Sequence, residues 1–189
     1  MIRIGILGDI GSGKSYVAKK FGYPVFNADY EVAKLYKLNK KIFNKLKKSL
    51  PKYIHSFPIE KREISNAILD NKNNLNKIVK IVHIEVRKKL NKFLNNHKNK
   101  KIIILDIPLL LENKINKKED ILVFVQSKQI DIVRKLKKRK NFNQKLLKKF
   151  KSIQYSVKYK KKKSNFIIKN DFTKKTVNDG VKNILKEIA

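Results

Sequence analysis

The stretch Gly8-Asp-Ile-Gly-Ser-Gly-Lys-Ser15 decides the fold of this 189-residue chain. It matches the pattern G-x-x-x-x-G-K-[ST], and it lies between the apolar run Ile2–Leu7 and a short helical pattern from Ser15 to Phe21. Glycines allow such a loop to turn tightly, so that backbone N–H groups and the N-terminus of the next helix surround a phosphate. The strand, the loop and the helix together predict a P-loop that binds a nucleoside triphosphate.

The residues of this loop have separate expected roles. The lysine of a P-loop bridges the β- and γ-phosphates, and the hydroxyl group that follows it binds Mg²⁺. We therefore expect ATP and Mg²⁺ to bind here, with Ser15 as a metal ligand and with these residues in contact with the nucleotide: Gly8, Gly11, Ser12, Gly13, Lys14, Ser15 and Tyr16. The alternative is a chance glycine-rich turn. GTPases, motors and helicases share this loop, and so it leaves the fate of the γ-phosphate open.

Short apolar runs separated by helical patterns indicate the rest of the fold. Runs of this kind are typical of strands that are buried on both faces of a parallel sheet. In the clearest helical pattern, Leu75 to His97, apolar residues recur at the spacing of a core-facing helix, and a second pattern from Thr173 to Ile188 predicts a closing helix. The sequence therefore predicts an α/β, three-layer P-loop NTPase fold, in which helices flank a parallel sheet. The expected strands are Ile2–Leu7, Pro24–Asn27, Ile102–Asp106, Ile121–Val125 and Asn165–Ile168.

Length and hydrophobic content predict a single domain. With 41% hydrophobic residues, a chain of 189 residues can bury one core without disulfides. Helical patterns broken by Pro51 and Pro58 indicate a region that binds the phosphoryl acceptor, and a helical stretch that lacks acidic residues and is half Lys or Arg indicates a lid. The expected division is a core at about 1–28, 100–133 and 164–189, a helical acceptor-binding region at about 29–99 and a lid at about 134–163.

Two aspartates follow expected strands, at the edge of the sheet where such folds bind ligands. Asp29 is placed to accept or orient the proton of an attacking hydroxyl group. The alternative is that it caps the next helix. Asp106 is expected to bind Mg²⁺, and its alternative role is to cap the turn before Pro108. Spacing alone does not choose between these interpretations.

Two basic side chains also have a functional and a structural interpretation. Arg139, in the expected lid, can neutralise charge on the transferring phosphoryl group. A single Arg in a run of lysines is more often part of a solvated face. His83 lies among apolar neighbours in the long helical pattern, which is typical of a partly buried histidine whose hydrogen bonds are satisfied. Its functional interpretation depends on a family resemblance.

Composition excludes several classes of function. The chain has no cysteine, which excludes disulfides, thiolate nucleophiles and cysteine-ligated metals, and its three histidines are scattered. The apolar runs are far shorter than the roughly 20 residues of a membrane-spanning helix, and the first run leads into the glycine loop rather than a cleavage site. We therefore expect a cytoplasmic protein without a membrane partner, and we expect a monomer.

The net charge of +33 is typical of proteins that bind polyanions, but the kind of charge indicates otherwise. Only five of the 48 basic residues are Arg, which specific nucleic-acid readers favour for its bidentate contacts. Lys, Asn and Ile are in excess together, as an AT-rich genome would produce at tolerant surface positions. We expect a solvated surface and no specific nucleic-acid partner. The alternative, based on the basic run at 158–163, is a nucleic-acid-binding ATPase.

Five landmarks, in order along the chain, resemble those of one family, dephospho-coenzyme A kinase. The glycine loop is similar to the family's G-G-I-G-S-G-K-S. The other four are Pro24-Val-Phe-Asn-Ala-Asp29 (P-V-[IF]-D-A-D in the family), Ile81-Val-His-Ile-Glu-Val-Arg87 (H-P-x-[VI]-R), Leu105-Asp-Ile-Pro-Leu-Leu-Leu-Glu112 (D-[VI]-P-L-L-[FL]-E), and Arg139, Gln154 and Lys160 with Asn165-Phe-Ile-Ile-Lys-Asn170 (R…Q…K…A-D-x-[VI]-I-x-N). The ordered set covers nearly the whole chain.

The resemblance implies an enzyme that uses ATP and Mg²⁺ to phosphorylate the ribose 3′-hydroxyl of dephospho-coenzyme A, the last step of coenzyme A synthesis. It implies that the catalytic residues are Lys14, Asp29 and Arg139, and that the acceptor contacts Asp29, His83, Arg87, Pro108 and Leu109. The chain departs from the family pattern at Asp9, Asn27, Ile84, Lys135 and Phe150. The alternative among enzymes is a kinase for a nucleoside monophosphate or another metabolite.

Overall fold

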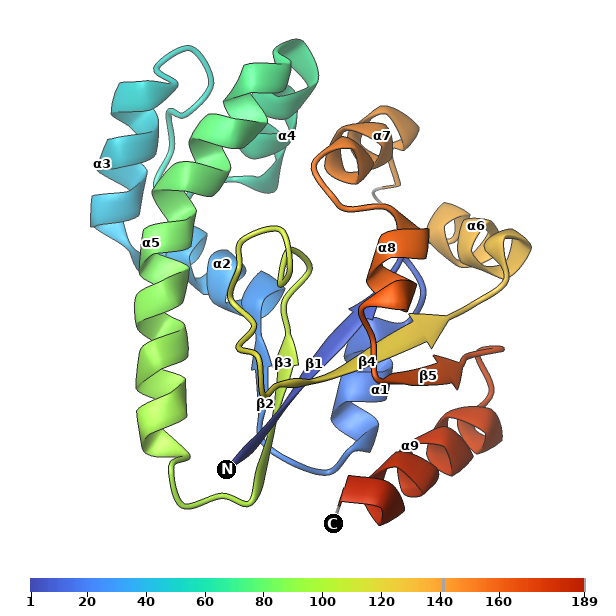
Figure 1. Ribbon diagram of the computed structural model, residues 1–189. Coiled ribbons are helices and arrows are strands. Elements are labelled where there is room, and N and C mark those ends of the chain that lie inside the picture. The colour runs from blue at the N-terminus through green and yellow to red at the C-terminus, as the bar shows by residue number, and fades with distance from the viewer. Residues whose placement is uncertain (141, 189) are drawn as a thin grey trace. The chain divides into compact units, whose positions relative to one another are not determined.

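A parallel sheet of five strands organises the chain in a computed structural model that describes residues 1–140 and 142–188 (Figure 1). The strand order is β2-β3-β1-β4-β5, and every neighbouring pair is parallel. The strands are β1 (Ile2–Gly8), β2 (Val25–Asn27), β3 (Ile102–Asp106), β4 (Ile121–Gln126) and β5 (Phe166–Lys169). Each lies within one residue of its predicted bounds, which confirms the α/β fold with a parallel sheet.

The helices divide between two compact units. The first unit comprises Met1–Asn27, His97–Phe142 and Ile153–Ala189, and the second comprises Ala28–Asn96 and Asn143–Ser152. The first contains the sheet with α1 (Lys14–Lys20), α6 (Gln129–Lys137), α8 (Val157–Lys162) and α9 (Lys174–Ile188). The second contains α2 (Ala28–Leu38), α3 (Lys40–Ser49), α4 (Lys61–Asp70), α5 (Lys72–Asn96) and α7 (Gln144–Ser152). Among the residues that the structure describes, no helix has the length and apolar character needed to cross a membrane.

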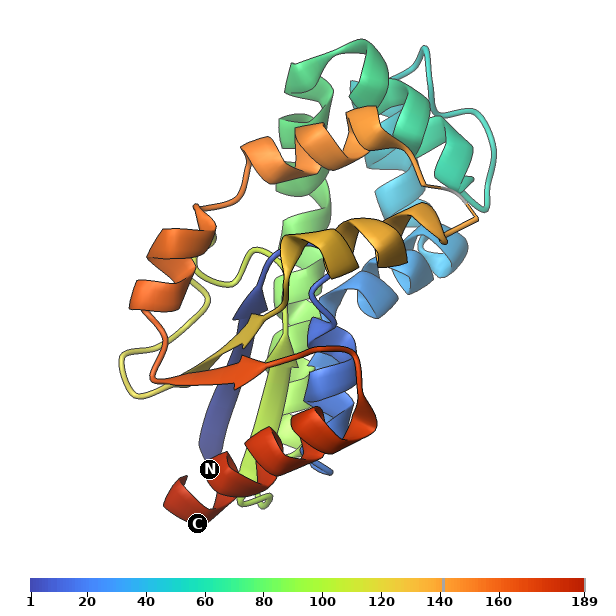
Figure 2. The same cartoon turned by 90° about the vertical axis from the view of Figure 1, so that its right-hand side faces the viewer.

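In the first unit, α1 and α9 cover one face of the sheet, and α8 contacts β1 on the opposite face (Figure 2). The predicted closing helix is α9, and its apolar stripe packs on the sheet beside that of α1. The resulting core cluster contains Ile4, Ile6, Val17, Ala18, Phe21, Ile102, Ile104, Val123, Val125, Ile168, Val177, Val181 and Ile184. This core fixes the carboxyl end of β1, where the glycine loop begins.

The second unit is all helical, and α5 is its centre. The predicted stripe on this helix is buried at Leu75, Ile78, Val82, Val86 and Leu90, so these residues form the core. Helices α2, α3 and α4 each contact α5, and α7 contacts α4. The stretch 134–163 contains the end of α6, all of α7 and all of α8. The expected lid therefore consists of several short helices rather than one long helix.

A buried carboxylate holds the irregular segment between α3 and α4. Glu63 Oε1 accepts hydrogen bonds from the backbone N–H groups of His55 (2.7 Å) and Ser56 (3.0 Å), and its Oε2 accepts from the N–H of Glu60 (3.2 Å). Burial of Glu63 favours the neutral acid, but these hydrogen bonds together outweigh burial and lower the pKa of Glu63. The segment, in which Pro51 and Pro58 prevent a continuous helix, thus depends on one ionised side chain.

We predict that Glu63→Gln lowers the free energy of unfolding by about 1–3 kcal/mol at neutral pH, because one carboxylate acceptor is replaced by an N–H donor facing other donors. The pKa of Glu63 is lowered on folding, so its contribution is complete above the unfolded value of about 4.3 and is lost as the pH falls through the folded value. Urea unfolding at neutral and strongly acidic pH measures both effects. Glu119→Gln, at an exposed position, is the control. An equal loss at both pH values would contradict the prediction.

Candidate active site

The glycine loop between β1 and α1 has no room for additional side chains. Gly8, Gly11 and Gly13 all have positive φ angles, of 150°, 89° and 89°. A Cβ atom on Gly8 would lie 2.6 Å from Ser12 Oγ and 2.8 Å from the carbonyl oxygen of Val125. The loop therefore presents mainly backbone groups, as a phosphate cradle requires. A nucleoside triphosphate fits this site by the chemistry of the residues that form it.

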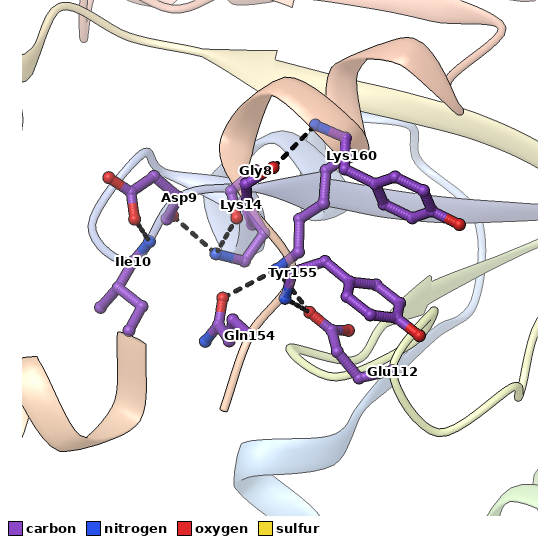
Figure 3. Close-up of polar contacts among 10 residues, drawn as sticks. Gly8, Asp9, Ile10, Lys14, Glu112, Gln154, Tyr155 and Lys160 are labelled. Atoms are coloured by element: carbon purple, nitrogen blue, oxygen red, sulfur yellow. Dashed lines mark hydrogen bonds and ion pairs between the residues drawn. The ribbon is translucent and has the colours of Figure 1, made fainter. Parts of the chain in front are cut away.

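Lys14 folds back over the loop that precedes it. Its Nζ donates hydrogen bonds to the carbonyl oxygens of Asp9 (2.8 Å) and Gly8 (3.4 Å), as Figure 3 shows. The Asp9 carboxylate, which replaces a glycine of the family pattern, accepts a hydrogen bond from the Ile10 N–H at 2.7 Å. The ammonium group therefore lies at the loop, and this position is compatible with the predicted role of a phosphate-binding lysine.

Ser15 and Tyr16 occupy the first turn of α1, and both are exposed. The Lys20 ammonium lies 5.4 Å from the centre of the Tyr16 ring. Because its side chain is exposed, the Ser15 hydroxyl group can reach a ligand of the loop. Its expected role as a metal ligand is compatible with this position.

Asp106 lies at the end of β3, opposite Asn27 of β2 in the sheet register. Its side chain is buried, and its Oδ2 accepts a hydrogen bond of 2.5 Å from Asn27 Nδ2. Asn27 replaces the first aspartate of the family's D-A-D, and here it orients the Asp106 carboxylate. The acceptor-binding candidates Pro108 and Leu109 follow β3 directly and are partly buried.

The donor set fits Mg²⁺ better than a metal held by protein alone. Among residues 1–140 and 142–188, no group of three or more His, Cys, Asp and Glu side chains could hold a metal ion. Mg²⁺ is commonly bound by one or two carboxylates together with substrate phosphates and water. Asp106 and Ser15, which belong to the same unit as the glycine loop, carry oxygen atoms of the kind that such an arrangement uses.

The expected lid begins beside the glycine loop. A Cβ atom on Gly11 would lie 2.9 Å from Leu136 Cγ and 3.1 Å from Ile132 Cγ2, so α6 packs directly on the loop. Arg139 is exposed and follows the C-terminus of α6. Its backbone N–H donates to the carbonyl oxygen of Leu136 at 3.0 Å, which continues the helical turn. Arg139 belongs to the same compact unit as Lys14, Ser15 and Asp106.

The other three candidates, Asp29, His83 and Arg87, belong to the second unit. Asp29 is exposed in the first turn of α2, which begins at Ala28. Burial and the nearby charge of Arg87 lower the pKa of His83. The alternative that His83 is a satisfied histidine is wrong, because its Nε2 is buried without a hydrogen-bond partner among the described residues.

A buried ion pair joins two of the family landmarks. Lys160 of α8 is 2% exposed, and its Nζ lies 3.0 Å from Oε1 of Glu112, in the loop after β3. The same Nζ donates to Gln154 Oε1 at 2.8 Å, and the Tyr155 N–H donates to Glu112 Oε1 at 2.8 Å (Figure 3). The pair therefore anchors the segment before α8 and α8 itself to the loop that contains Pro108 and Leu109.

Sequence reasoning identified Gln154 and Lys160 by their spacing but gave no role to Glu112. Glu112 and Lys160 are 48 positions apart, a separation that produces no periodic signal. Because 43 of the 48 basic residues are lysines, the sequence does not indicate which lysine would pair with Glu112. The only available signal was that Glu112 ends a quoted motif. The ion pair could therefore be recognised only after the fold had brought the two segments together.

Comparison with known proteins places the chain near one group of kinases. A family model described as "Dephospho-CoA kinase" matches residues 2–176. The dephospho-CoA kinase of Wolbachia pipientis wMel is 33% identical over 191 aligned positions, which cover 98% of this chain and 97% of that protein. The crystal structure of TT1252 from Thermus thermophilus has a TM-score of 0.79 and 26% identity, covering 100% of this chain and 98% of that chain. A dephospho-CoA kinase from Campylobacter jejuni has the same fold, with a TM-score of 0.62, 19% identity and coverage of 99% and 97%.

We predict that Lys160→Met lowers the free energy of unfolding by about 3–5 kcal/mol, because it leaves the Glu112 carboxylate buried without its cation. Glu112→Leu should have a similar cost, and the double substitution should cost clearly less than the sum of the two. A double-mutant cycle by urea unfolding measures this coupling.

The exposed pair of Lys117 and Glu119, with an Nζ to Oε1 distance of 3.8 Å, provides the matched control. The same cycle with Lys117→Met and Glu119→Leu should give a coupling of about 0–1 kcal/mol. Additive effects at Lys160 and Glu112 would show that their ion pair has no special role.

Proposed function

The chain belongs to the dephospho-CoA kinase family, and on that premise we propose how its residues catalyse phosphorylation of the ribose 3′-hydroxyl of dephospho-coenzyme A by ATP. The products are coenzyme A and ADP, and the reaction is the last step of coenzyme A biosynthesis. The observation that carries the proposal is the glycine loop at the end of β1, with Lys14 already folded over it.

In this proposal, the N–H groups of the glycine loop bind the β-phosphate, and Lys14 exchanges its contacts with the Asp9 and Gly8 carbonyl oxygens for contacts with the β- and γ-phosphates. An ammonium group has three donors and a flexible stem, which makes this exchange easy. Exposure of Tyr16 beside the loop supports its expected contact with the nucleotide.

We further propose that Ser15 and Asp106 hold Mg²⁺, with Asn27 orienting the carboxylate. Mg²⁺, when bound, neutralises charge on the β- and γ-phosphate oxygens. The hydrogen bond from Asn27 fixes the orientation of the Asp106 carboxylate, whose oxygens would bind the metal or its water ligands. Arg139, exposed at the end of α6, neutralises the charge that spreads over the transferring phosphoryl group.

In this proposal, five side chains contact the acceptor: Asp29, His83, Arg87, Pro108 and Leu109. Asp29 orients the 3′-hydroxyl group of the acceptor or accepts its proton. The buried Nε2 of His83, which has no hydrogen-bond partner among the described residues, supports a polar contact with the acceptor, because such a bond would satisfy a costly unpaired group. Arg87, one turn further along α5, provides positive charge for the acceptor's phosphates, while Pro108 and Leu109 provide apolar contacts.

The proposal includes the cellular setting expected from the sequence. It treats the protein as cytoplasmic and monomeric, and it assigns no function in nucleic-acid binding to the lysine-rich surface. The abundance of Lys over Arg supports this last point, because Lys lacks the planar fork with which Arg makes bidentate contacts to bases and phosphates.

The test is to incubate the purified protein with ATP, Mg²⁺ and dephospho-coenzyme A, and to follow coenzyme A and ADP together by chromatography. We expect stoichiometric formation of both products, and loss of both when EDTA removes the metal. Reactions with AMP, with CMP and without acceptor are the controls. Formation of ADP only with a nucleotide acceptor would replace this substrate by a nucleoside monophosphate.

We predict that Asp29→Asn lowers kcat by about 10²–10⁴-fold, because the amide cannot accept the proton of the hydroxyl group. ATP affinity should change little, since the nucleotide is held by the first unit. Steady-state kinetics and direct measurement of ATP binding separate the two effects. Asp179→Asn, on the exposed surface of α9, is the matched control and should retain full activity. An unchanged rate for Asp29→Asn would exclude the proposed role.

A further inference from the structure

The carbonyl oxygen of Ser12 receives hydrogen bonds from two side chains outside the glycine loop. Asn170 Nδ2, just after β5, donates to it at 2.8 Å, and this bond is buried. Ser127 Oγ, just after β4, donates to it at 3.1 Å. Ser12 itself is 1% exposed. Two neighbouring strands thus end in donors that hold the same peptide carbonyl of the loop.

Asn170 is itself fixed in orientation. Its Oδ1 accepts a hydrogen bond from the Phe172 N–H at 2.9 Å, so its Nδ2 is left to donate to Ser12. The Asn170 side chain is buried, and its own backbone N–H donates to the carbonyl oxygen of Gln126 at 2.7 Å. The side-chain amide is therefore a rigid bridge between β5 and the glycine loop.

The bridge from Asn170 explains why position 13 is a glycine. A Cβ atom on Gly13 would lie 2.4 Å from Asn170 Nδ2, and Gly13 has a φ angle of 89°. Only glycine combines this backbone conformation with such a close approach. The contact shows that Asn170 packs directly against the peptide unit that joins Ser12 to Gly13.

The geometry of a peptide unit gives the bridge a functional consequence. In a planar trans peptide, the carbonyl oxygen and the N–H group of the next residue point in opposite directions. Donors that hold the Ser12 carbonyl oxygen on one side therefore direct the Gly13 N–H to the other side. A phosphate cradle consists of backbone N–H groups that point toward the same anion.

We propose that Ser127 and Asn170 are positioning residues for nucleotide binding, which fix the Ser12–Gly13 peptide so that the Gly13 N–H faces the nucleotide phosphates. This inference rests on the proposed function, because it assumes that the loop binds ATP. Neither residue touches the reacting atoms, and both act through the loop backbone. The effect of removing either donor should therefore appear in ATP affinity and not in affinity for the acceptor.

The first test uses Ser127, whose hydroxyl group can be removed without leaving a large cavity. ATP affinity is measured by calorimetry without acceptor, and KM for ATP and for dephospho-coenzyme A by steady-state kinetics. Ser127→Ala should weaken ATP binding by about 3–10-fold, the usual effect of one hydrogen bond. KM for the acceptor should change by less than about twofold, and Ser127→Thr, which keeps the hydroxyl group, should restore ATP affinity.

Asn170→Asp is the second variant. It keeps the acceptor for the Phe172 N–H but places an oxygen against the Ser12 carbonyl oxygen, so it should weaken ATP binding more than Ser127→Ala does. The matched control is Ser164→Ala, because Ser164 Oγ also donates to a backbone carbonyl oxygen, that of Lys160, at 2.9 Å. This control should retain wild-type ATP affinity. If Asn170→Asp fails to fold, the two Ser127 variants still decide the question.

The outcomes distinguish this inference from the proposed function. Unchanged ATP affinity in Ser127→Ala, or an equal weakening of ATP and acceptor binding, would overturn the positioning role and leave only a structural one. Failure of the wild-type protein to make coenzyme A would instead overturn the acceptor assignment, while the effect of Ser127 on ATP binding would still be measurable. Loss of ATP affinity in Ser127→Ala with rescue by Ser127→Thr would support the inference.

Discussion

The candidate site depends on a loop backbone that has no room for a side chain at Gly8, Gly11 or Gly13. The loop from Gly8 to Gly13 is enclosed by Val125 at the end of β4, by Leu136 of α6 and by Asn170 after β5. Each neighbour comes from a different part of the chain, so the loop can take its shape only when the sheet has assembled. The cradle is therefore a property of the whole first unit rather than of eight consecutive residues.

Much of the fold could be predicted because it follows from local chemistry. Apolar runs of strand length predicted all five strands, and the stripe from Leu75 to Leu90 predicted the core face of α5. The glycine loop was visible because its function requires unusual residues in a fixed order. These signals lie within short windows of sequence, and tertiary contacts did not override them.

The polar contacts of the site could not be predicted in the same way. The bond between Asn27 and Asp106 joins residues 79 positions apart, and those from Ser127 and Asn170 to Ser12 span 115 and 158 positions. A single serine after a strand has no distinctive spacing, so nothing in the sequence marked Ser127. His83 shows the opposite case, because its apolar neighbours indicated a satisfied side chain, whereas its Nε2 is buried and unpaired among the described residues. Hydrogen-bond partners are set by the fold, and the sequence lists only the groups that need them.

The burial of Lys160 has a consequence for how such a chain evolves. Exposed lysines contribute little individually, so a biased supply of mutations can add or exchange them almost neutrally. Lys160 cannot be exchanged in this way. An arginine or a glutamate at this position would have to fit against Glu112 and Gln154 in a buried space that holds one ammonium group. The lysine content of the chain therefore falls into two parts. Exposed lysines can be exchanged with little effect on stability, whereas the buried Lys160 is constrained by its contacts with Glu112 and Gln154.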